Sequence, residues 1–277
     1  MKRKKILTGM LFAAGLFLCA YPLVSSIIER RHQEEAVATY QTEVESTDTA
    51  EVKQVLAQAQ RYNEMLWQTK GLIINEIQNE VLSDKNYQEQ LKLAEHGIMG
   101  AIHIPKINVM LPVYHGTDEE ILKNGVGHMQ ESSLPVGGEN THCLLTGHRG
   151  LPNSKLFTRL DELETGDLFF LETCNEKLAY RVNEIEVIAP EDVDGLGIQA
   201  GKDQVSLITC TPYGLNTHRL VVTGERIPYT EEAEQETKAE MLSFRELLFA
   251  ALPFLFVSAG VLQLIKNRRR KSRDEKI

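Results

Sequence analysis

Two residues near the ends of neighbouring apolar runs could together perform acyl transfer through a cysteine thiolate. Cys210 follows the apolar run 205–209 and precedes a turn, so we expect its thiol to face a groove rather than the core. Arg219 begins the next apolar run. Two antiparallel strands joined by a loop of this length would place the thiol and the guanidinium on facing strand ends. A fixed cation there would favour the thiolate and stabilise a developing oxyanion.

The proton transfers of such a reaction require a histidine, and His148 is the candidate. It lies between Gly147 and Gly150, just past the apolar run that ends at Thr146. The glycines allow a tight loop that would leave the imidazole exposed, and a protonated imidazole can donate to a departing amine. The spacing along the chain does not by itself bring the three residues together. Taken singly, each of the three residues more often has a structural role than a catalytic one. Cys210 could be a core cysteine, Arg219 a surface arginine and His148 a loop histidine.

The cysteines outside the apolar N-terminal segment, which contains Cys19, are Cys143, Cys174 and Cys210. If they lie outside the cell, their odd number leaves at least one thiol unpaired where disulfides can form. A buried inert thiol is the usual explanation of such a residue, and a reactive thiol is the less common one.

The remaining histidines indicate neither a second base nor a metal site. His142 and Cys143 have no further close pair of ligands, so we predict no metal and no cofactor. We expect His115, His128 and His218 to be structural hydrogen-bonding residues.

Two long apolar segments indicate a membrane protein. Residues 6–28 are 23 uncharged positions after a basic start, enough to cross a bilayer. A cleaved signal peptide is the alternative, but its apolar region is usually shorter, about 7 to 15 residues. Residues 247–265 are 19 uncharged positions that include Pro253 and precede a basic cluster. The alternative for this segment is a buried soluble helix, whereas the basic flanks predict two spans with both tails in the cytoplasm.

The charge distribution excludes a nucleic-acid-binding function. The chain has 30 Lys and Arg against 39 Asp and Glu, and the basic residues are concentrated in the two tails. The part between the spans is therefore strongly acidic, which would repel a phosphate backbone.

The pattern between the spans changes from helical to β-type. Residues 30–95 are rich in Glu, Gln and Ala, lack proline and carry apolar residues at helical spacing, which predicts a helical flank. From residue 98 onward short apolar runs alternate with turn residues, and one short helix is expected at 154–163. The expected strands are 102–107, 109–113, 142–146, 168–171, 178–188, 205–209 and 219–223. Many short strands with few helices favour a mainly β barrel.

These observations divide the chain into seven parts. They are a cytoplasmic tail at 1–5, a transmembrane or signal anchor at 6–28, a helical flank with a possible lid region at 29–95, a β-barrel at 96–230, a linker at 231–246, a second transmembrane helix at 247–265 and a basic cytoplasmic tail at 266–277. The barrel is thereby predicted to lie outside the cell on a two-span protein of the cell membrane.

Several motifs, in order, resemble a known enzyme family. Residues 206–220 read SLITCTPYGLNTHRL, which closely resembles the signature of class C sortases, the pilin-polymerising cysteine transpeptidases of Gram-positive bacteria. Ser206 stands where this signature usually has threonine. Similar segments upstream are IPKI at 104–107, LPVYHGT at 111–117, GH at 127–128, SLPVGG at 133–138 and TGHRGLP at 146–152. The resemblance covers roughly residues 60–230.

The resemblance implies a sortase β-barrel of about eight strands, with His148, Cys210 and Arg219 as the catalytic residues. In this family the cysteine attacks the Thr–Gly bond of a Leu-Pro-X-Thr-Gly-like sorting signal and forms a thioester with the threonine. A lysine amine of another pilin subunit then displaces the enzyme, so the product is an isopeptide bond between subunits. The implied partners are pilin subunits that carry the sorting signal and an acceptor lysine.

One family feature is missing, and two other functions remain open. Many class C sortases cover the cleft with a lid that carries an Asp-Pro-aromatic tripeptide, but no proline occurs here between Pro22 and Pro105. Trp67 and Tyr87 are candidate substitutes, although packing on the barrel is the simpler role for both. The alternative functions are a sortase of another class that anchors proteins to the cell wall, and a non-catalytic barrel that binds sorting signals.

Overall fold

The computed structural model describes residues 2–69, 83–94, 97–151, 153–237 and 244–274. The chain forms two compact units, Arg30–Ala239 and, separately, Met1–Glu29 together with Glu240–Ile277. The first unit holds a β-barrel with its flanking helices, and the second holds the two apolar ends of the chain.

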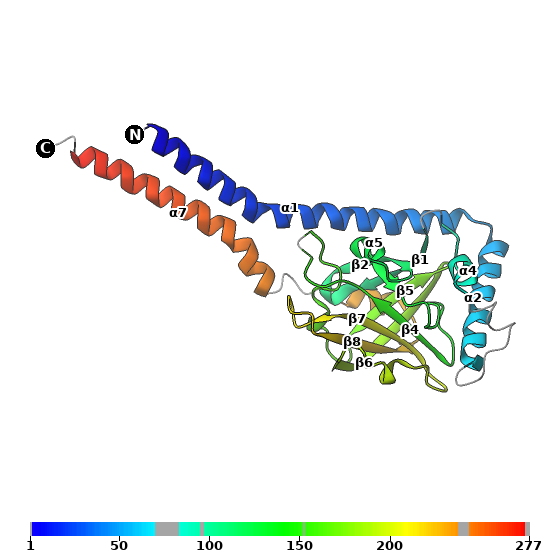
Figure 1. The fold of residues 1–277 in the computed structure, drawn as a ribbon. Helices are drawn as coiled ribbons and strands as arrows, with labels where there is room; N and C mark the ends of the chain where they lie inside the picture. The colour runs from blue at the N-terminus through cyan, green and yellow to red at the C-terminus, as the bar shows by residue number, and fades with distance from the viewer. Residues whose placement is uncertain (1, 70–82, 95–96, 152, 238–243, 275–277) are drawn as a thin grey trace. The chain divides into compact units, whose positions relative to one another are not determined.

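The barrel has eight strands that close in the order β1-β2-β3-β4-β7-β8-β6-β5 (Figure 1). The strands are β1 (Ile98–Ile104), β2 (Val109–His115), β3 (Val126–His128), β4 (Thr141–Thr146), β5 (Leu168–Thr173), β6 (Glu176–Ile188), β7 (Asp203–Thr211) and β8 (His218–Ile227). The pairs β2 with β3 and β4 with β7 are parallel, and the other neighbouring pairs are antiparallel. This architecture confirms the predicted mainly β barrel.

The barrel interior is packed with apolar side chains from positions that alternate along the strands. The Phe169 ring of β5 and the Tyr180 ring of β6 stack with centroids 5.5 Å apart, and the backbone of β8 lies directly against them. Gly224 of β8 makes this possible, because a Cβ at that position would lie 2.5 Å from the Phe169 ring. The fully buried members of this core include Ile102, Leu145, Phe169, Tyr180, Leu207 and Val222.

Helices from the part of the chain that precedes β1 flank the barrel, as the sequence predicts. They are α1 (Lys2–Ser46), α2 (Thr49–Thr69) and α4 (Asp84–Glu89). Beyond Arg30, α1 packs on the barrel through Tyr40, whose hydroxyl donates to the Met99 carbonyl at 3.3 Å. Asn63 of α2 makes two hydrogen bonds with the backbone of Leu134, at 2.7 and 3.1 Å. These buried polar contacts fix the flank against the loop between β3 and β4.

Some short elements differ from the sequence expectations. The structure adds α5 (Glu119–Asn124) and the three-residue strand β3, and it contains the 3-10 turns η1 (Pro105–Ile107), η2 (Leu160–Glu162) and η3 (Asp194–Leu196). The helix expected at 154–163 is wrong, because only η2 is helical there. Instead, the Phe157 amide donates to the carbonyl of His148 at 3.1 Å, and the Gly150 amide donates to the Thr158 hydroxyl at 3.1 Å. These bonds fold the segment back on the His148 loop.

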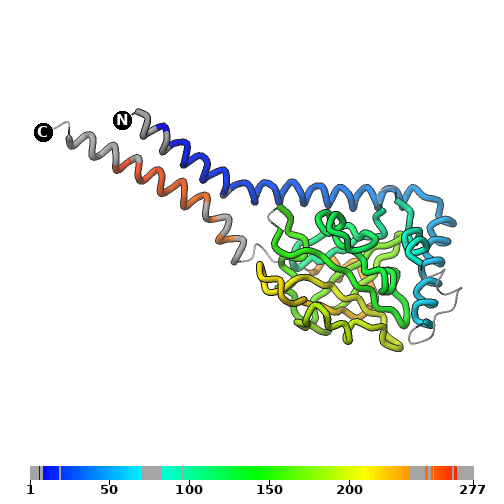
Figure 2. The backbone as a smooth tube through the Cα atoms, viewed as in Figure 1, coloured from blue at the N-terminus to red at the C-terminus, as the bar shows by residue number. Residues whose placement is uncertain are grey.

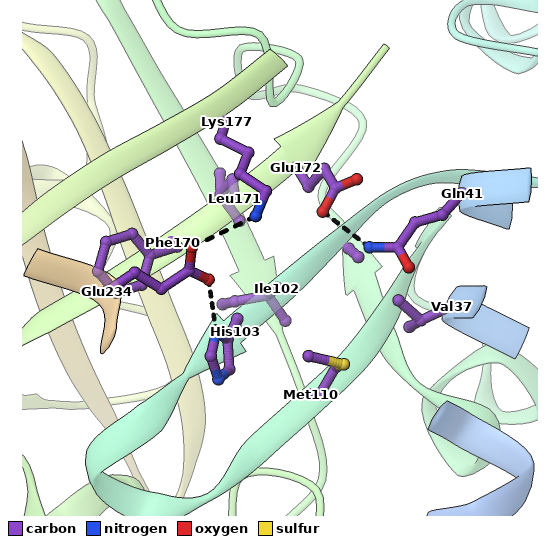
Figure 3. Close-up of a pocket in the computed structure, with 11 residues that line it drawn as sticks. Val37, Gln41, Ile102, His103, Met110, Phe170, Leu171, Glu172, Lys177 and Glu234 are labelled. Atoms are coloured by element: carbon purple, nitrogen blue, oxygen red, sulfur yellow. Dashed lines mark hydrogen bonds and ion pairs between the residues drawn. The ribbon is translucent and has the colours of Figure 1, made fainter. Parts of the chain in front are cut away.

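A charged cluster attaches the C-terminal segment to the barrel (Figure 3). The short helix α6 (Glu231–Glu236) occupies part of the expected linker. Its Glu234 carboxylate contacts His103 of β1 at 2.9 Å and Lys177 of β6 at 3.3 Å, and it accepts from the Tyr229 hydroxyl at 2.7 Å. The pKa of Glu234 is lowered although burial opposes this, because these partners stabilise the carboxylate. A small cavity of about 70 Å³ lies beside the cluster.

The second unit contains the two apolar ends of the chain. Among the residues that the structure describes, one helix, α1, is long and apolar enough over Gly9–Ser46 to cross a membrane. The C-terminal helix α7 (Phe244–Asp274) has a shorter apolar stretch, Pro253–Gln263. An N-terminal apolar helix therefore fits the predicted anchor, whereas the second span stays a prediction.

Candidate active site

The register of β7 and β8 places Cys210 opposite Arg219. The two strands lie side by side in the backbone tube (Figure 2). The cysteine is the penultimate residue of β7, and the arginine is the second residue of β8. Directly opposed residues of an antiparallel pair project from the same face of the sheet. The facing strand ends expected from the loop length are therefore present, while the catalytic roles of the two residues remain predictions.

His148 reaches the same end of the barrel because β4 and β7 run parallel. Thr146 pairs with Ile208, so His148 and Cys210 each lie two residues beyond a paired position. The ladder continues past the strand, since the Gly147 amide donates to the Ile208 carbonyl at 3.0 Å and the Thr209 hydroxyl donates to the Gly147 carbonyl at 2.7 Å. The histidine loop is thus tied to the cysteine strand immediately before both residues.

Gly147 is required by close packing at this point. A Cβ there would lie 2.8 Å from the Phe157 ring, closer than real contacts allow. The ring therefore lies directly against the loop backbone that carries His148.

Solvent access distinguishes Cys210 from the other thiols of the barrel. Cys143 and Cys174 are each 3% exposed, whereas Cys210 is only partly buried, and all three are free. Burial raises the pKa of Cys174 to about 12 and that of Cys143 well above its ordinary value, so both stay protonated and unreactive. Among the described thiols of this unit, only Cys210 can meet a substrate.

The cation opposite Cys210 has no compensating carboxylate among the described residues. The Arg219 guanidinium donates only to backbone carbonyls, those of Asn216 at 3.4 Å and His218 at 3.1 Å. Within the same part of the chain, neither the Cys210 thiol nor the His148 ring makes a hydrogen bond. All three groups are therefore available to a ligand, and the positive charge of Arg219 can act on a thiolate or an oxyanion beside it.

The other histidines of the barrel have structural partners. His115 contacts the Gln90 carbonyl at 2.8 Å, and His142 contacts the Ser206 hydroxyl at 2.7 Å. Ser206 is the position where the related signature has threonine, and its hydroxyl also contacts Thr223 at 2.7 Å. The exposed His218 contacts the neighbouring Thr217 hydroxyl. The described residues contain no group of three side chains that could hold a metal ion.

His128 is fully buried and held in its neutral form. Its Nε2 donates to the Ser133 carbonyl at 2.8 Å, which leaves Nδ1 to accept from the Tyr87 hydroxyl at 2.9 Å. Burial lowers its pKa to about 4. Tyr87 of α4 also accepts from the Gly116 amide and is 0% exposed, so it packs against the barrel, the simpler of the two roles considered for it.

We expect His128 to make the protein less stable in acid. Between pH 6.5 and 4 the unfolded chain takes up a proton at this residue and the folded chain does not, so unfolding becomes easier as the pH falls. The shift corresponds to roughly 3 kcal/mol of unfolding free energy across that window. Unfolding titrations of wild type and His128→Gln at several pH values should show a pH slope that is one proton smaller in the variant.

The exposed His218 provides the control for this measurement. His218→Gln should keep the wild-type slope, because it replaces an exposed ring and leaves His128 and its buried hydrogen bonds in place. An unchanged slope in His128→Gln would contradict the assignment of a neutral buried ring.

The possible lid region lies partly outside the described residues. It includes 70–82, which the structure does not describe, and Trp67 precedes this segment as a half-buried residue near the end of α2. Sequence reasoning also missed Arg149, Asp161 and Tyr213, which surround the bases of the His148 and Cys210 loops. Adjacency to His148 is the signal that could have drawn attention to Arg149.

Comparison with known proteins places this geometry in context. The model of the Sortase domain family matches residues 102–227. The crystal structure of sortase C1 from Streptococcus agalactiae is 42% identical, has a TM-score of 0.64 and covers 71% of this chain and 100% of that chain. Sortase C of Clostridium perfringens, solved with the C-terminal cell wall sorting motif, is 40% identical with a TM-score of 0.61, and covers 70% of this chain and 99% of that one.

A curated relative matches over a shorter region. Sortase D of Bacillus subtilis is 34% identical over 131 residues, which are 46% of this chain and 63% of the relative. The chain thus spans slightly less than two thirds of that relative's length.

Proposed function

Because the chain belongs to the sortase family, whose members are cysteine transpeptidases, we propose that it joins pilin subunits through a thioester on Cys210. Its solved neighbours include class C sortases, and its signature at 206–220 is of the same class. The observation that carries the proposal is the paired register of Cys210 with Arg219, beside the loop of His148.

The proposed reaction has two acyl transfers. The Cys210 thiolate attacks the threonine carbonyl of a Leu-Pro-X-Thr-Gly-like signal, and Arg219 stabilises the oxyanion that forms. As the Thr–Gly bond breaks, the His148 imidazolium gives its proton to the departing glycine amine. A lysine amine then attacks the thioester, His148 takes its proton, and the thiolate leaves as the isopeptide bond forms. The cysteine and histidine begin and end as an ion pair or share one proton.

The substrate class is supported by a neighbour and by chemistry. The Clostridium perfringens neighbour was solved with a cell wall sorting motif, which makes the same kind of peptide the first substrate to test here. The acidic charge between the two apolar segments favours an acceptor that presents lysine.

Mass spectrometry can test the first half of the reaction. Full-length protein in detergent micelles is incubated with a Leu-Pro-X-Thr-Gly peptide, and the expected result is a covalent adduct on Cys210 that lacks the glycine. A pilin subunit with its own signal and an amine of the peptidoglycan type are then added as competing acceptors. A ladder of covalent multimers supports polymerisation, whereas single adducts to amines of the peptidoglycan type would show that the chain is an anchoring sortase instead.

We also propose that both apolar segments, 6–28 and 247–265, span the membrane, with the barrel outside and both basic tails inside. Aromatic rings and glycines of the two helices fit reciprocally within the second unit. A Cβ on Gly15 would lie 3.2 Å from the Phe256 ring, a Cβ on Gly260 would lie 2.6 Å from the Phe12 ring, and the two rings are 5.8 Å apart. Small residues of this kind let membrane helices approach closely.

Gly260→Leu should separate the two helices, because the new side chain would occupy the space of the Phe12 ring. The pairing is measured in membranes with a short thiol crosslinker between Leu16→Cys and Val257→Cys, in a Cys19→Ala background. Gly9→Leu is the control, since nothing lies within 4 Å of a Cβ there. Equal crosslinking in Gly260→Leu, in Gly9→Leu and in the chain that keeps both glycines would contradict the helix pairing.

A further inference from the structure

One buried arginine joins the loop of His148 to the strand end of Cys210. Arg149 directly follows His148, and its side chain is only 3% exposed. Its Nη1 donates to the Thr211 hydroxyl at 3.0 Å and lies 3.5 Å from the Cys210 carbonyl oxygen. The guanidinium thus contacts the residue after the cysteine and the cysteine backbone itself.

The other side of the guanidinium is held by a carboxylate. The Arg149 Nη2 pairs with the Asp161 Oδ2 at 2.5 Å, and Asp161 lies in the turn η2. A planar guanidinium can bind two partners in fixed directions, which a lysine ammonium cannot do. Three segments that are distant in sequence therefore meet at one side chain.

Aromatic packing supports the same connection. The Arg149 guanidinium carbon lies 5.9 Å from the centroid of the Tyr213 ring, in the loop that follows Cys210. Gly150 has φ +81°, and a Cβ there would lie 3.1 Å from the same ring. The loops that follow the histidine and the cysteine are thus packed directly against each other.

Resting on the proposed function, we propose that Arg149 is a positioning residue that sets the geometry between His148 and Cys210. Asp161 neutralises its charge, so it is not the cation that stabilises the reacting atoms. Arg219 can fill that role, because the described residues give it no carboxylate partner. Arg149 acts through Thr211 and the Cys210 backbone. Small errors of position between reacting groups reduce rates strongly, about 100-fold for 1 Å.

The test compares Arg149→Lys with wild type as full-length proteins in detergent micelles. The first readout is the rate at which iodoacetamide alkylates Cys210 as a function of pH, which reports how the thiol and imidazole share a proton and needs no peptide substrate. The second readout is kcat and KM for a Leu-Pro-X-Thr-Gly peptide. We expect a shifted alkylation profile, a kcat about 100-fold lower and a KM within about twofold of wild type.

Arg159→Lys is the matched control. Arg159 is another buried arginine of the same segment, with a side chain 8% exposed, and it binds the Glu162 carboxylate at 2.7 Å and lies 3.4 Å from the Ile107 carbonyl. This variant should melt at a lower temperature and keep the wild-type alkylation profile and kcat. Equal effects of the two substitutions would overturn the proposal, because general loosening of the segment would explain both.

Thr211→Val tests the contact without removing the arginine, so it remains informative if Arg149→Lys does not fold. Valine has nearly the same shape as threonine and only removes the hydroxyl that accepts from Arg149. A smaller shift of the profile in the same direction supports positioning, and an unchanged profile together with unchanged kcat would contradict it. If wild type alkylates normally but turns over no peptide, the proposed function fails while the alkylation arm still decides the role of Arg149.

Discussion

Cys210→Ala is expected to abolish the covalent adduct with a sorting-signal peptide and to leave the fold nearly intact. No other described thiol of the barrel can replace it, because Cys143 and Cys174 are buried and protonated. The substitution removes one sulfur from a partly buried strand end, so we expect a loss of stability of about 1 kcal/mol or less. Intact-mass spectrometry measures the adduct, and a thermal melt measures the fold.

Cys174→Ala is the control for a lost thiol. This change leaves a small cavity in the core, so it should lower the melting temperature while the adduct still forms. Full function of Cys210→Ala in cells would favour the alternative of a non-catalytic barrel that binds sorting signals. An adduct on a different residue would remove the cysteine from the mechanism.

Arg219→Lys is expected to slow acylation about 100-fold, the usual effect of removing one donor from an oxyanion site. Lysine keeps the positive charge but loses the planar group with several directed donors. The fold should persist, because the guanidinium bonds only to the carbonyls of Asn216 and His218 at the edge of the site. Single-turnover acylation with the peptide, followed by quenching and mass spectrometry, gives the rate.

Arg226→Lys is the matched control on the same strand. Arg226 lies toward the opposite end of β8, where it pairs with Asp203 at 3.7 Å. Its substitution should leave the acylation rate unchanged. Wild-type acylation by Arg219→Lys would exclude a directed role for this guanidinium and leave at most a role for its charge.

The sequence predicted the architecture well where patterns are long and regular. Apolar runs separated by Gly, Pro and Asn gave most of the strands, and apolar residues at helical spacing gave the flank that contains Tyr62. The strand β3 has only three residues and was missed, because so short a run carries no periodicity. At 154–163 the apolar residues Phe157 and Leu160 have helical spacing, but bonds to the His148 loop prevail over that local preference.

The candidate site was predictable in part for a related reason. Cys210 and Arg219 belong to consecutive antiparallel strands, so the length of the intervening loop was enough to pair them. His148 belongs to β4, which reaches β7 by a parallel, non-local pairing that local spacing does not encode. Only the resemblance of its motif to a known family placed it beside the others. The ion pair of Arg149 with Asp161 depends on the path of a loop, which no pattern in the sequence revealed.

The ladder hydrogen bonds of β7 with β4 and β8 determine where the chain can change in length without moving the site. The positions of Cys210 and Arg219 depend on strand register, not on the length of the 189–202 connection before β7. One residue inserted within β7 would turn the thiol to the opposite face, whereas residues added to that connection would leave it in place. Changes of length within 189–202 should therefore leave the positions of Cys210 and Arg219 unchanged, whereas β7 itself tolerates no such change.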